Sequence, residues 1–399
     1  MPKISELGRR LPTSAIRKLV PYADAAKEKG IKVYHLNIGQ PDLPTPHQAV
    51  EVLRKAEMDV VSYTHSAGNL SYRKKLVEYY KQHEIHVDVS DIIVTISGSE
   101  ALNFAFSVCL DEGDEVIIPE PYYTNYNAFA IQTKTTIKTI PADIETAFAL
   151  PPIEEFEKVI TPKTKAILIC NPNNPTGYLY SKAEIEALGM LAKKHKLFLF
   201  ADEVYREFCY DGQVHTSVLH IDGIEDNAII IDSVSKRYSA CGARIGAIVS
   251  KNKEVMAASM KMAQARLSPP YFAQIFAEAA IDVPDSFFAI GRAEYDKRRN
   301  YLINALNNIE GCRCPNPTGA FYSILELPID DSDRFCQWLL EEFSYNGETV
   351  MLAPATGFYS DPEKGKKQAR VAYVLNVEDL QRAVKCLEEA LKIYPGRTI

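Results

Sequence analysis

Continuous runs of apolar residues recur along the middle of the chain and predict the strands of one buried sheet. The runs are Ile92–Ile96, Glu115–Pro119, Thr135–Ile140, Ala166–Cys170, Leu197–Ala201, Ala228–Asp232 and Ile245–Val249. Most are apolar at nearly every position rather than at every second one, which is typical of strands covered by helices on both faces. We therefore predict an α/β fold with a mostly parallel, doubly wound sheet of seven strands.

The pattern differs at the two ends of the chain. Residues 1–47 have the pattern of an irregular arm with a short helix from Ile16, and alternating strands reappear only at Phe321–Leu327 and Arg370–Val374. Helical periodicity is expected over Gln48–Met58, Ser71–His83, Leu102–Leu110, Ser286–Asn307, Asp331–Phe343 and Val377–Tyr394. We predict a large domain over residues 48–285 and a smaller α+β domain made of residues 286–399 together with the arm, residues 1–47.

Polar, aromatic and reactive residues follow five of the predicted strands directly. They are Ser97–Glu100, Tyr122 with Tyr123, the N-P-N-N-P-T-G segment from Asn171, the D-E-V-Y segment from Asp202, and S-V-S-K from Ser233. Open α/β sheets bind ligands outside the carboxyl ends of their strands, so these groups are expected to meet at one edge. The Ser97–Glu100 turn before a helix predicts an anion site, because free N–H groups at a helix start face the ligand. Neither a G-x-x-x-x-G-K-[ST] nor a G-x-G-x-x-G pattern is present.

Lys236 lies at the end of a buried strand among small and hydroxylated residues. A lysine that is partly desolvated and close to another cation has a lowered pKa, and its amine is then nucleophilic toward carbonyl groups. The neighbouring serines and Arg244, eight residues further on, suit a phosphate group. Together these features suggest pyridoxal phosphate held by the lysine as a Schiff base. Taken alone, the same residues also fit a solvated turn between strand and loop.

Composition and charge exclude several classes of function. The 399 residues are 46% hydrophobic and 24% charged, which is typical of a globular protein with room for two domains. The net charge of −7 and the lack of a basic run argue against a nucleic-acid partner. No apolar stretch is long enough to span a membrane, and the first residues lack the core of a signal peptide. The eight cysteines and eight histidines show neither metal-ligand nor disulfide spacing, so we expect no metal and a cytoplasmic location.

Four short motifs in this order carry a family resemblance. They are N-P-T-G at Asn174–Gly177, D-x-x-Y at Asp202–Tyr205, S-x-x-K at Ser233–Lys236, and a late Arg370 in Q-A-R-V-A-Y. With them, the chain resembles a class I aminotransferase of the pyridoxal-phosphate fold-type I superfamily, and the aspartate aminotransferases in particular. The resemblance covers nearly the whole chain and implies pyridoxal 5'-phosphate as cofactor, small amino acid and 2-oxo acid substrates, and a homodimer with shared active sites.

The resemblance also implies a role for each cofactor residue. Lys236 would bind the cofactor covalently and then move the substrate α-proton, and Asp202 would keep the pyridine nitrogen protonated. Tyr205 and Asn174 would hydrogen-bond the phenolic oxygen of the ring, and Tyr123 would stack on its face. The phosphate would be held by the backbone N–H groups of Ser99 and Glu100, the side chains of Ser233 and Arg244, and Tyr63 from the neighbouring subunit.

The substrate residues follow from the resemblance in the same way. Arg370 would grip the α-carboxylate with its planar guanidinium, assisted by Asn174 and the backbone of Gly39. One bacterial branch of aspartate aminotransferases carries a lysine in the phosphate turn that reaches the second carboxylate of the substrate, and Ser99 occupies that position here. Arg266 is our candidate for that second, distal carboxylate, supplied by the partner subunit.

The resulting hypothesis is a transferase of nitrogenous groups. It would move the amino group of an L-amino acid, with aspartate the best single choice, to 2-oxoglutarate by a ping-pong cycle through pyridoxamine phosphate. Aromatic amino acids or alanine are the next donors to consider. A carbon–sulfur or cyclising lyase that uses the same cofactor residues is the enzyme alternative, and an idle pyridoxal-phosphate-binding regulator is the alternative outside the enzymes.

Overall fold

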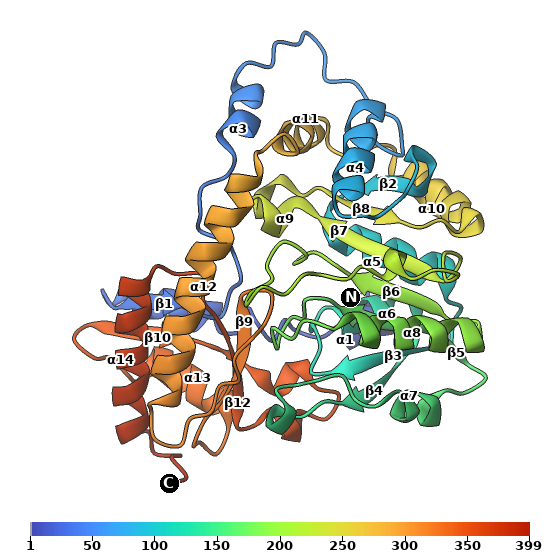
Figure 1. Ribbon diagram of the computed structural model, residues 1–399. Coiled ribbons are helices and arrows are strands. Elements are labelled where there is room, and N and C mark those ends of the chain that lie inside the picture. Colours follow the sequence, from blue (N-terminus) through green and yellow to red (C-terminus); the bar gives the residue numbers. More distant parts are fainter. Residues whose placement is uncertain (1) are drawn as a thin grey trace.

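A seven-stranded sheet forms the centre of the computed structural model, which describes residues 2–399 (Figure 1). The strands follow the order β2-β8-β7-β6-β5-β3-β4, and only β8 runs antiparallel to its neighbours. Their bounds are β2 (Ile92–Thr95), β3 (Glu115–Glu120), β4 (Thr136–Pro141), β5 (Thr164–Cys170), β6 (Phe198–Asp202), β7 (Ala228–Ser233) and β8 (Gly246–Val249). The predicted α/β class and its mostly parallel seven-stranded sheet are confirmed, with each strand end within two residues of its predicted position.

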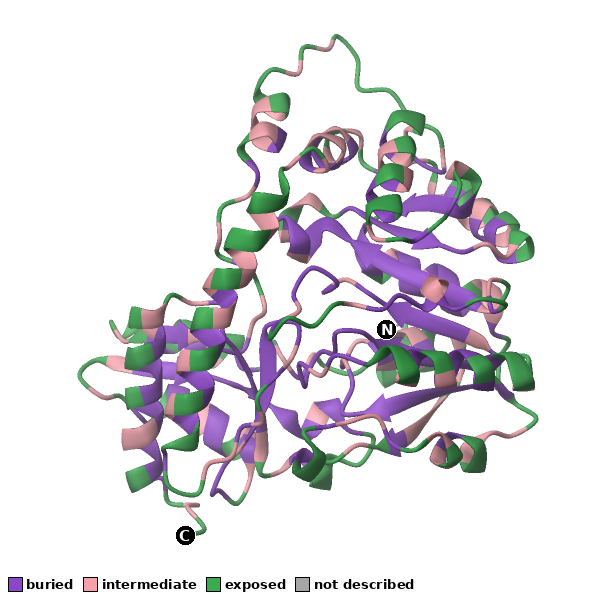
Figure 2. Ribbon diagram, in the orientation of Figure 1, coloured by how far each residue is buried: buried purple, intermediate pink, exposed green. Residues whose placement is uncertain are grey.

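Helices cover both faces of this sheet. Successive side chains of a strand point to opposite faces, so Ile230 of β7 joins one apolar cluster and its neighbours Ile229 and Ile231 join the other. Apart from β4 at the edge of the sheet, the strands are accordingly buried along most of their length (Figure 2). The covering helices are α4 (Leu70–Gln82), α5 (Ser97–Cys109), α6 (Tyr126–Thr133), α7 (Ile153–Val159), α8 (Lys182–His195), α10 (Lys253–Arg266) and α11 (Tyr271–Ala280).

The start of α5 was predicted wrongly. The helix begins at Ser97, five residues before the expected Leu102. Ser97, Gly98 and Ser99 have low helix propensity, which conceals the start in the sequence. The carboxylate of Glu100 accepts a hydrogen bond from the Ile96 N–H at 2.8 Å, and this contact helps to hold the first turn.

A second group of elements lies beside the large sheet, and the long helix α12 leads from the end of α11 to this group (Figure 1). It contains an antiparallel three-stranded sheet of order β11-β12-β9 and a parallel pair, β1 with β10. The elements are β1 (Lys32–His35), β9 (Tyr322–Glu326), β10 (Glu348–Met351), β11 (Ala353–Pro354), β12 (Gln368–Ala372), α12 (Asp285–Asn307), α13 (Ser332–Glu341) and α14 (Val377–Ile393).

The first 47 residues are more regular than the sequence indicates. They contain α1 (Glu6–Arg10), α2 (Val20–Glu28) and the strand β1, where an irregular arm with one short helix was predicted. The pairing of β1 with β10 explains the difference, because its partner is about 300 residues away and local patterning does not reveal it. The remaining short elements are α3 (His47–Arg54), α9 (Val234–Arg237) and 3₁₀ turns at Val89–Asp91, Ile144–Thr146, Val218–His220, Cys241–Ala243, Ala355–Phe358 and Pro362–Gly365.

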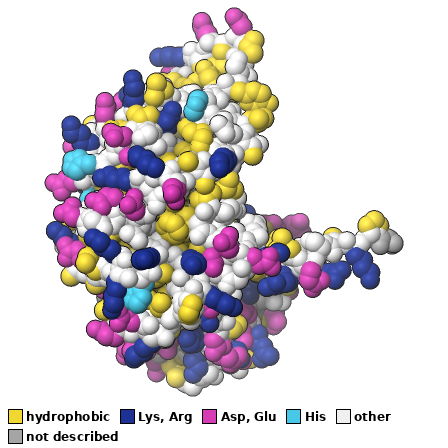
Figure 3. Space-filling view, turned by 90° about the vertical axis from the view of Figure 1, so that its right-hand side faces the viewer, with side chains coloured by type: hydrophobic (Ala, Val, Ile, Leu, Met, Phe, Trp, Pro, Cys, Tyr) yellow, Lys and Arg dark blue, Asp and Glu magenta, His cyan; other side chains and the backbone are white. Residues whose placement is uncertain are grey.

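Charged side chains of both signs are interspersed over the face of the molecule shown in Figure 3. This face therefore offers no large area of a single sign that would attract a polyanion. Over residues 2–399, no helix combines the length and the apolar character that crossing a bilayer would require.

Candidate active site

Lys236 stands in α9, a one-turn helix that follows β7 directly. Its Nζ atom donates a hydrogen bond to the carbonyl oxygen of Gly39 at 2.9 Å and lies 3.6 Å from Cys241 Sγ. The amine therefore bridges the large sheet and the N-terminal part of the chain. A side chain at position 39 would not fit, because a Cβ atom there would lie 1.6 Å from the hydroxyl oxygen of Tyr322. Gly39 thus offers its carbonyl oxygen to Lys236, whereas the resemblance assigned the backbone of Gly39 to the substrate carboxylate.

Asp202 ends β6 and is buried. Its Oδ2 atom accepts a hydrogen bond from the hydroxyl of Tyr126 at 2.9 Å, while Oδ1 is buried without a hydrogen-bond partner among the described residues. Burial raises the pKa of Asp202 to about 6, although the hydrogen bonds from Tyr126 and from the backbone N–H of Val204 act in the opposite direction. An unpaired buried carboxylate oxygen is the natural partner of a positively charged N–H donor, such as a protonated ring nitrogen.

The start of α5 forms an anion cradle together with β7 and β8. The backbone of Ser97 is left-handed, with φ 68°, and its Oγ atom accepts a hydrogen bond from the guanidinium of Arg244. Ser233 donates its hydroxyl hydrogen to Ser235 Oγ at 2.8 Å. A Cβ atom at Gly246 would lie only 2.8 Å from the backbone nitrogen of Gly98, so β8 approaches this turn closely. Helix-start N–H groups, hydroxyls and a guanidinium together suit a phosphate group.

Arg370 and Asn174 are brought together from distant parts of the chain. Arg370 lies in β12 and is buried; its Nη1 atom donates to Asn174 Oδ1 at 2.9 Å and its Nη2 atom to the carbonyl oxygen of Asn37 at 2.5 Å. The guanidinium also lies over the ring of Tyr322, 4.4 Å from its centroid, and 5.2 Å from that of Phe358. These contacts fix the plane of the guanidinium, as two-pronged carboxylate binding requires.

Tyr205 and Tyr123 provide the aromatic groups of the site. The hydroxyl of Tyr205 lies 3.0 Å from that of Tyr322, and both rings are buried. Tyr123 follows β3 and accepts a hydrogen bond from the side-chain amide of Asn125 at 2.8 Å. Burial raises the pKa of Tyr123 to about 12 and holds that of Tyr205 well above its ordinary value, so both phenols remain protonated at neutral pH.

Two of the predicted site residues lie elsewhere in this single chain. The guanidinium of Arg266 donates to Glu100 at 2.6 Å and to the carbonyl oxygen of Ser66 at 2.7 Å, so it helps to fix the first turn of α5. Tyr63 is 78% exposed in the segment between α3 and α4 and makes no contribution to the site of its own chain. An exposed tyrosine at this position is free to contact another subunit.

Three residues of the site were missed in the sequence. Tyr126 binds Asp202, the ring of Tyr322 lies under Arg370, and the carbonyl of Asn37 accepts from Arg370. Tyr126 opens α6 three residues after Tyr123, and the two rings meet edge to face with centroids 5.5 Å apart; its closeness in the chain to Tyr122 and Tyr123 is a usable signal for Tyr126. Tyr322 and Asn37 reach the site only through the packing of β1, β9, β10 and β12, and no local pattern marks them.

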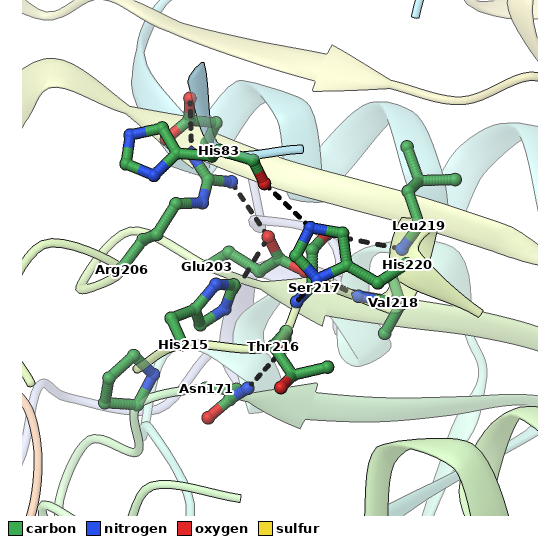
Figure 4. A network of polar contacts seen from close by, with 12 residues as sticks. His83, Asn171, Glu203, Arg206, His215, Thr216, Ser217, Val218, Leu219 and His220 are labelled. Atoms are coloured by element: carbon green, nitrogen blue, oxygen red, sulfur yellow. Dashed lines mark hydrogen bonds and ion pairs between the residues drawn. The ribbon is translucent and has the colours of Figure 1, made fainter. Parts of the chain in front are cut away.

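A buried network of charged groups lies behind the site (Figure 4). Glu203 accepts hydrogen bonds from Arg206 at 2.8 Å, from Ser217 Oγ at 2.9 Å and from the Val218 N–H at 3.0 Å. Arg206 also lies 3.7 Å from the carboxylate of Asp232. Because these contacts involve the residues that directly follow Asp202, they fix the backbone from which Asp202 and Tyr205 project.

Asp232 is the second carboxylate of this network. It forms an ion pair with Arg237 and accepts a hydrogen bond from the hydroxyl of Tyr80 at 2.6 Å. Burial alone would raise the pKa of Asp232, but the guanidinium groups of Arg237 and Arg206 hold it well below its ordinary value. Asp232 is therefore a stronger acid than Asp202 on the neighbouring strand.

Comparison with known proteins gives a consistent result. The family model for aminotransferase class I and II matches residues 31–387. The chain is 31% identical over 393 residues to an aspartate aminotransferase of Bacillus subtilis, covering 96% of this chain and 97% of the relative. It is 30% identical over 387 residues to an aromatic-amino-acid aminotransferase of Thermococcus litoralis, covering 95% and 96%. The solved structure of an aspartate aminotransferase from Thermus thermophilus with maleate superimposes with a TM-score of 0.89 at 28% identity, covering 98% of this chain and 100% of that one.

Proposed function

Because the chain belongs to the family of class I and II aminotransferases, we propose that it moves the amino group of aspartate to 2-oxoglutarate. That the protein is an aminotransferase follows from the family; the choice of donor and acceptor, the position of the cofactor and the subunit arrangement are the proposal. Pyridoxal phosphate, when bound, supplies a carbonyl group that reacts with amines and a ring that withdraws electrons from the substrate Cα.

The residues present suit this cofactor in charge and shape. Asp202 would bind the protonated ring nitrogen through its free Oδ1 atom, and the side chains of Tyr205 and Asn174 would bind the phenolic oxygen of the ring. The phosphate would take the place prepared by the N–H groups of Ser99 and Glu100 and by Ser233 and Arg244. Tyr123 would cover one face of the ring. Tyr63 of a second subunit would complete the phosphate site in a homodimer, which its exposed position supports.

The chain's own groups would carry out binding and proton transfer. Arg370, held in its plane by Asn174 and Tyr322, would bind the substrate α-carboxylate and so orient the Cα–H bond. The amine of Lys236 would take the proton from the substrate Cα and deliver it to the former aldehyde carbon of the cofactor, acting first as a base and then as an acid. Asp202 would stay ionised during both steps, because a cationic partner lowers its pKa again.

The observation that carries the proposal is the free Oδ1 atom of Asp202 in the same site as a lysine amine. A buried carboxylate oxygen without a hydrogen-bond partner, such as Asp202 Oδ1, lowers the stability of the folded protein. The charge of Lys236 also acts to lower the pKa of Asp202, so the two groups are electrostatically coupled. A site of this kind is suited to a ligand that is cationic at one end and reacts with an amine.

Further parts of the proposal concern organisation. The large domain would comprise residues 48–285 and the small domain residues 1–47 and 286–399, which the pairing of β1 with β10 supports. All eight cysteines are free thiols, which fits a reducing compartment, and we propose the cytoplasm. Arg266 remains a candidate for the distal carboxylate only if its guanidinium leaves Glu100 and Ser66; an unchanged ratio of aspartate to alanine rates in Arg266→Ala would exclude this role.

The test is the absorbance spectrum of the purified holoenzyme. Addition of aspartate without an acceptor is expected to remove the visible band of the lysine-bound cofactor, and 2-oxoglutarate is expected to restore it. Lys236→Ala should show neither change. A band that persists with aspartate but is lost with alanine or phenylalanine would refute aspartate as the donor. Release of pyruvate and ammonia instead of amino transfer would indicate a lyase.

A further inference from the structure

The distal carboxylate of a dicarboxylic substrate needs a cation that the known parts of the site do not supply. Arg370 is engaged with the α-carboxylate position, Arg244 with the phosphate cradle, and Arg266 with Glu100. The amine of Lys236 has the proposed role of transferring the proton of the substrate Cα. Within this chain, a cation for the distal carboxylate would therefore come from another element at the mouth of the site.

The segment from Ser14 to Leu19, which precedes α2, lies at this mouth. The side-chain amide of Asn37 donates to the carbonyl oxygen of Ile16 at 3.3 Å, and the backbone carbonyl of the same Asn37 accepts from Arg370. Ala15 is buried against Gly357, where an added Cβ atom would lie 2.4 Å from that of Ala15. A single residue, Asn37, thus connects the backbone of Ile16 with Arg370, the proposed ligand of the α-carboxylate.

Phe358 connects Arg370, the segment at Ile16 and the loop that carries Tyr122 and Tyr123. Its ring lies against the guanidinium of Arg370, and its carbonyl oxygen accepts from the backbone N–H of Tyr122 at 3.0 Å. Ile16 packs against the apolar cluster that contains Phe358. Tyr123, directly after Tyr122, therefore faces the same mouth as the segment at Ile16.

Arg17 is the cation that this segment presents. Its side chain is exposed, and no hydrogen-bond or ion-pair partner is found for it within the described part of the chain. Its neighbour Lys18 is turned the other way and forms an ion pair with Asp333 of α13. Burial raises the pKa of Tyr123, and Arg17 and Arg370 are the two cations that oppose this rise, so both guanidinium groups lie near that phenol.

We propose that Arg17 binds the distal carboxylate of aspartate and 2-oxoglutarate and thereby selects dicarboxylic substrates. The inference rests on the proposed function, since it names the residue behind the choice of donor and acceptor. The two carboxylates of the substrate would then be held at opposite ends, by Arg370 and by Arg17, with the Cα–H bond directed at Lys236. An unpaired arginine on a flexible stem is suited to this task, because no internal ion pair has to be broken.

The test compares the rates of the aspartate and alanine half-reactions in the holoenzyme and its Arg17→Met variant. Loss of a charge-assisted contact is expected to lower kcat/KM for aspartate by about 10- to 100-fold, whereas the alanine value should change by less than about 2-fold. Binding of maleate, a dicarboxylate without an amino group, should weaken by a similar factor. Arg17→Lys keeps the charge and is expected to retain part of the preference for aspartate. Arg10→Met, which removes an exposed arginine of α1, is the matched control and should behave as wild type.

Each other outcome has a definite meaning. If wild type prefers aspartate and Arg17→Met keeps the same ratio of aspartate to alanine rates, the role of Arg17 is refuted while the proposed function stands. Equal losses for both amino acids would also refute it, because they would indicate a structural role. If wild type itself reacts as well with alanine as with aspartate, the proposed donor fails and the inference with it.

Discussion

Asp202 allows a quantitative test of the electrostatics of the site in the protein freed of cofactor. Its pKa of about 6 lies well above the ordinary 3.8 that the unfolded chain would have. As the pH rises from about 4 to about 6, the unfolded state therefore ionises before the folded one. The free energy of unfolding falls over this range and is lower by about 3 kcal/mol in total above pH 7.

The variant Asp202→Asn cannot ionise and escapes this loss. The asparagine carbonyl can still accept the hydrogen bond from Tyr126, so the packing is conserved. We expect the stability of the variant relative to wild type to increase by about 1.5 kcal/mol between pH 5 and pH 8, the part of the total that falls within this window. The affinity of the variant for the cofactor should be lower than that of wild type, because asparagine has no negative charge to pair with the ring nitrogen.

Urea unfolding of the cofactor-free proteins, followed by far-ultraviolet circular dichroism at one fixed protein concentration, measures this difference. Asp222→Asn, which changes an exposed carboxylate, serves as the control and should show no comparable pH dependence. A stability difference between Asp202→Asn and wild type that is the same at pH 5 and pH 8 would show that burial does not raise the pKa of Asp202. The argument from the free Oδ1 atom would then fail as well.

Three further predictions address the other parts of the site. Arg370→Lys loses the planar two-pronged contact and should lower kcat/KM for aspartate and alanine alike by about 10- to 100-fold, in contrast to the selective effect expected at Arg17. Gly246→Ala places a Cβ atom 2.4 Å from the carbonyl oxygen of Asp232 and 2.8 Å from the nitrogen of Gly98, so it should weaken cofactor binding in a fluorescence titration of the cofactor-free enzyme; an unchanged affinity would mean that the phosphate is held elsewhere. Asp232→Asn leaves Arg206 and Arg237 buried without their shared carboxylate and should lower the free energy of unfolding by about 3–5 kcal/mol in urea denaturation, and a loss below about 1 kcal/mol would contradict the role of this ion network.

The strands of the large sheet were predictable because each is a continuous apolar run between polar turns. Residues at or shortly after a strand end, such as Asp202 and Lys236, were predictable for the same reason, since the fold brings the strand ends together. Motif resemblance added Arg370 and Asn174, and the structure places these two in direct contact. In these cases a short stretch of sequence contains the information that is needed.

The contributions that were missed depend on distant contacts. Tyr322 acts through its position between Tyr205 and Arg370, and Asn37 through its backbone carbonyl, which any residue would possess. The start of α5 was placed too late because three residues of low helix propensity open it. Arg266 was proposed as a ligand of the distal carboxylate from the partner subunit, and no pattern in its neighbourhood indicates that Glu100 of its own chain holds its guanidinium. Side-chain direction and pairing are set by tertiary packing rather than by local sequence.

The parallel pairing of β1 with β10 also has a consequence for the order in which the chain folds. Lys32 lies opposite Glu348, so the N-terminal strand finds its neighbour only when about nine tenths of the chain has left the ribosome. The strands β2 to β8 all lie between these two points and can pair among themselves earlier. Closing so long a loop is slow compared with local pairing. Pairing of β1 with β10 and of β12 with β9, and with it the placement of Arg370, is therefore expected to be the last event in the synthesis of an active subunit.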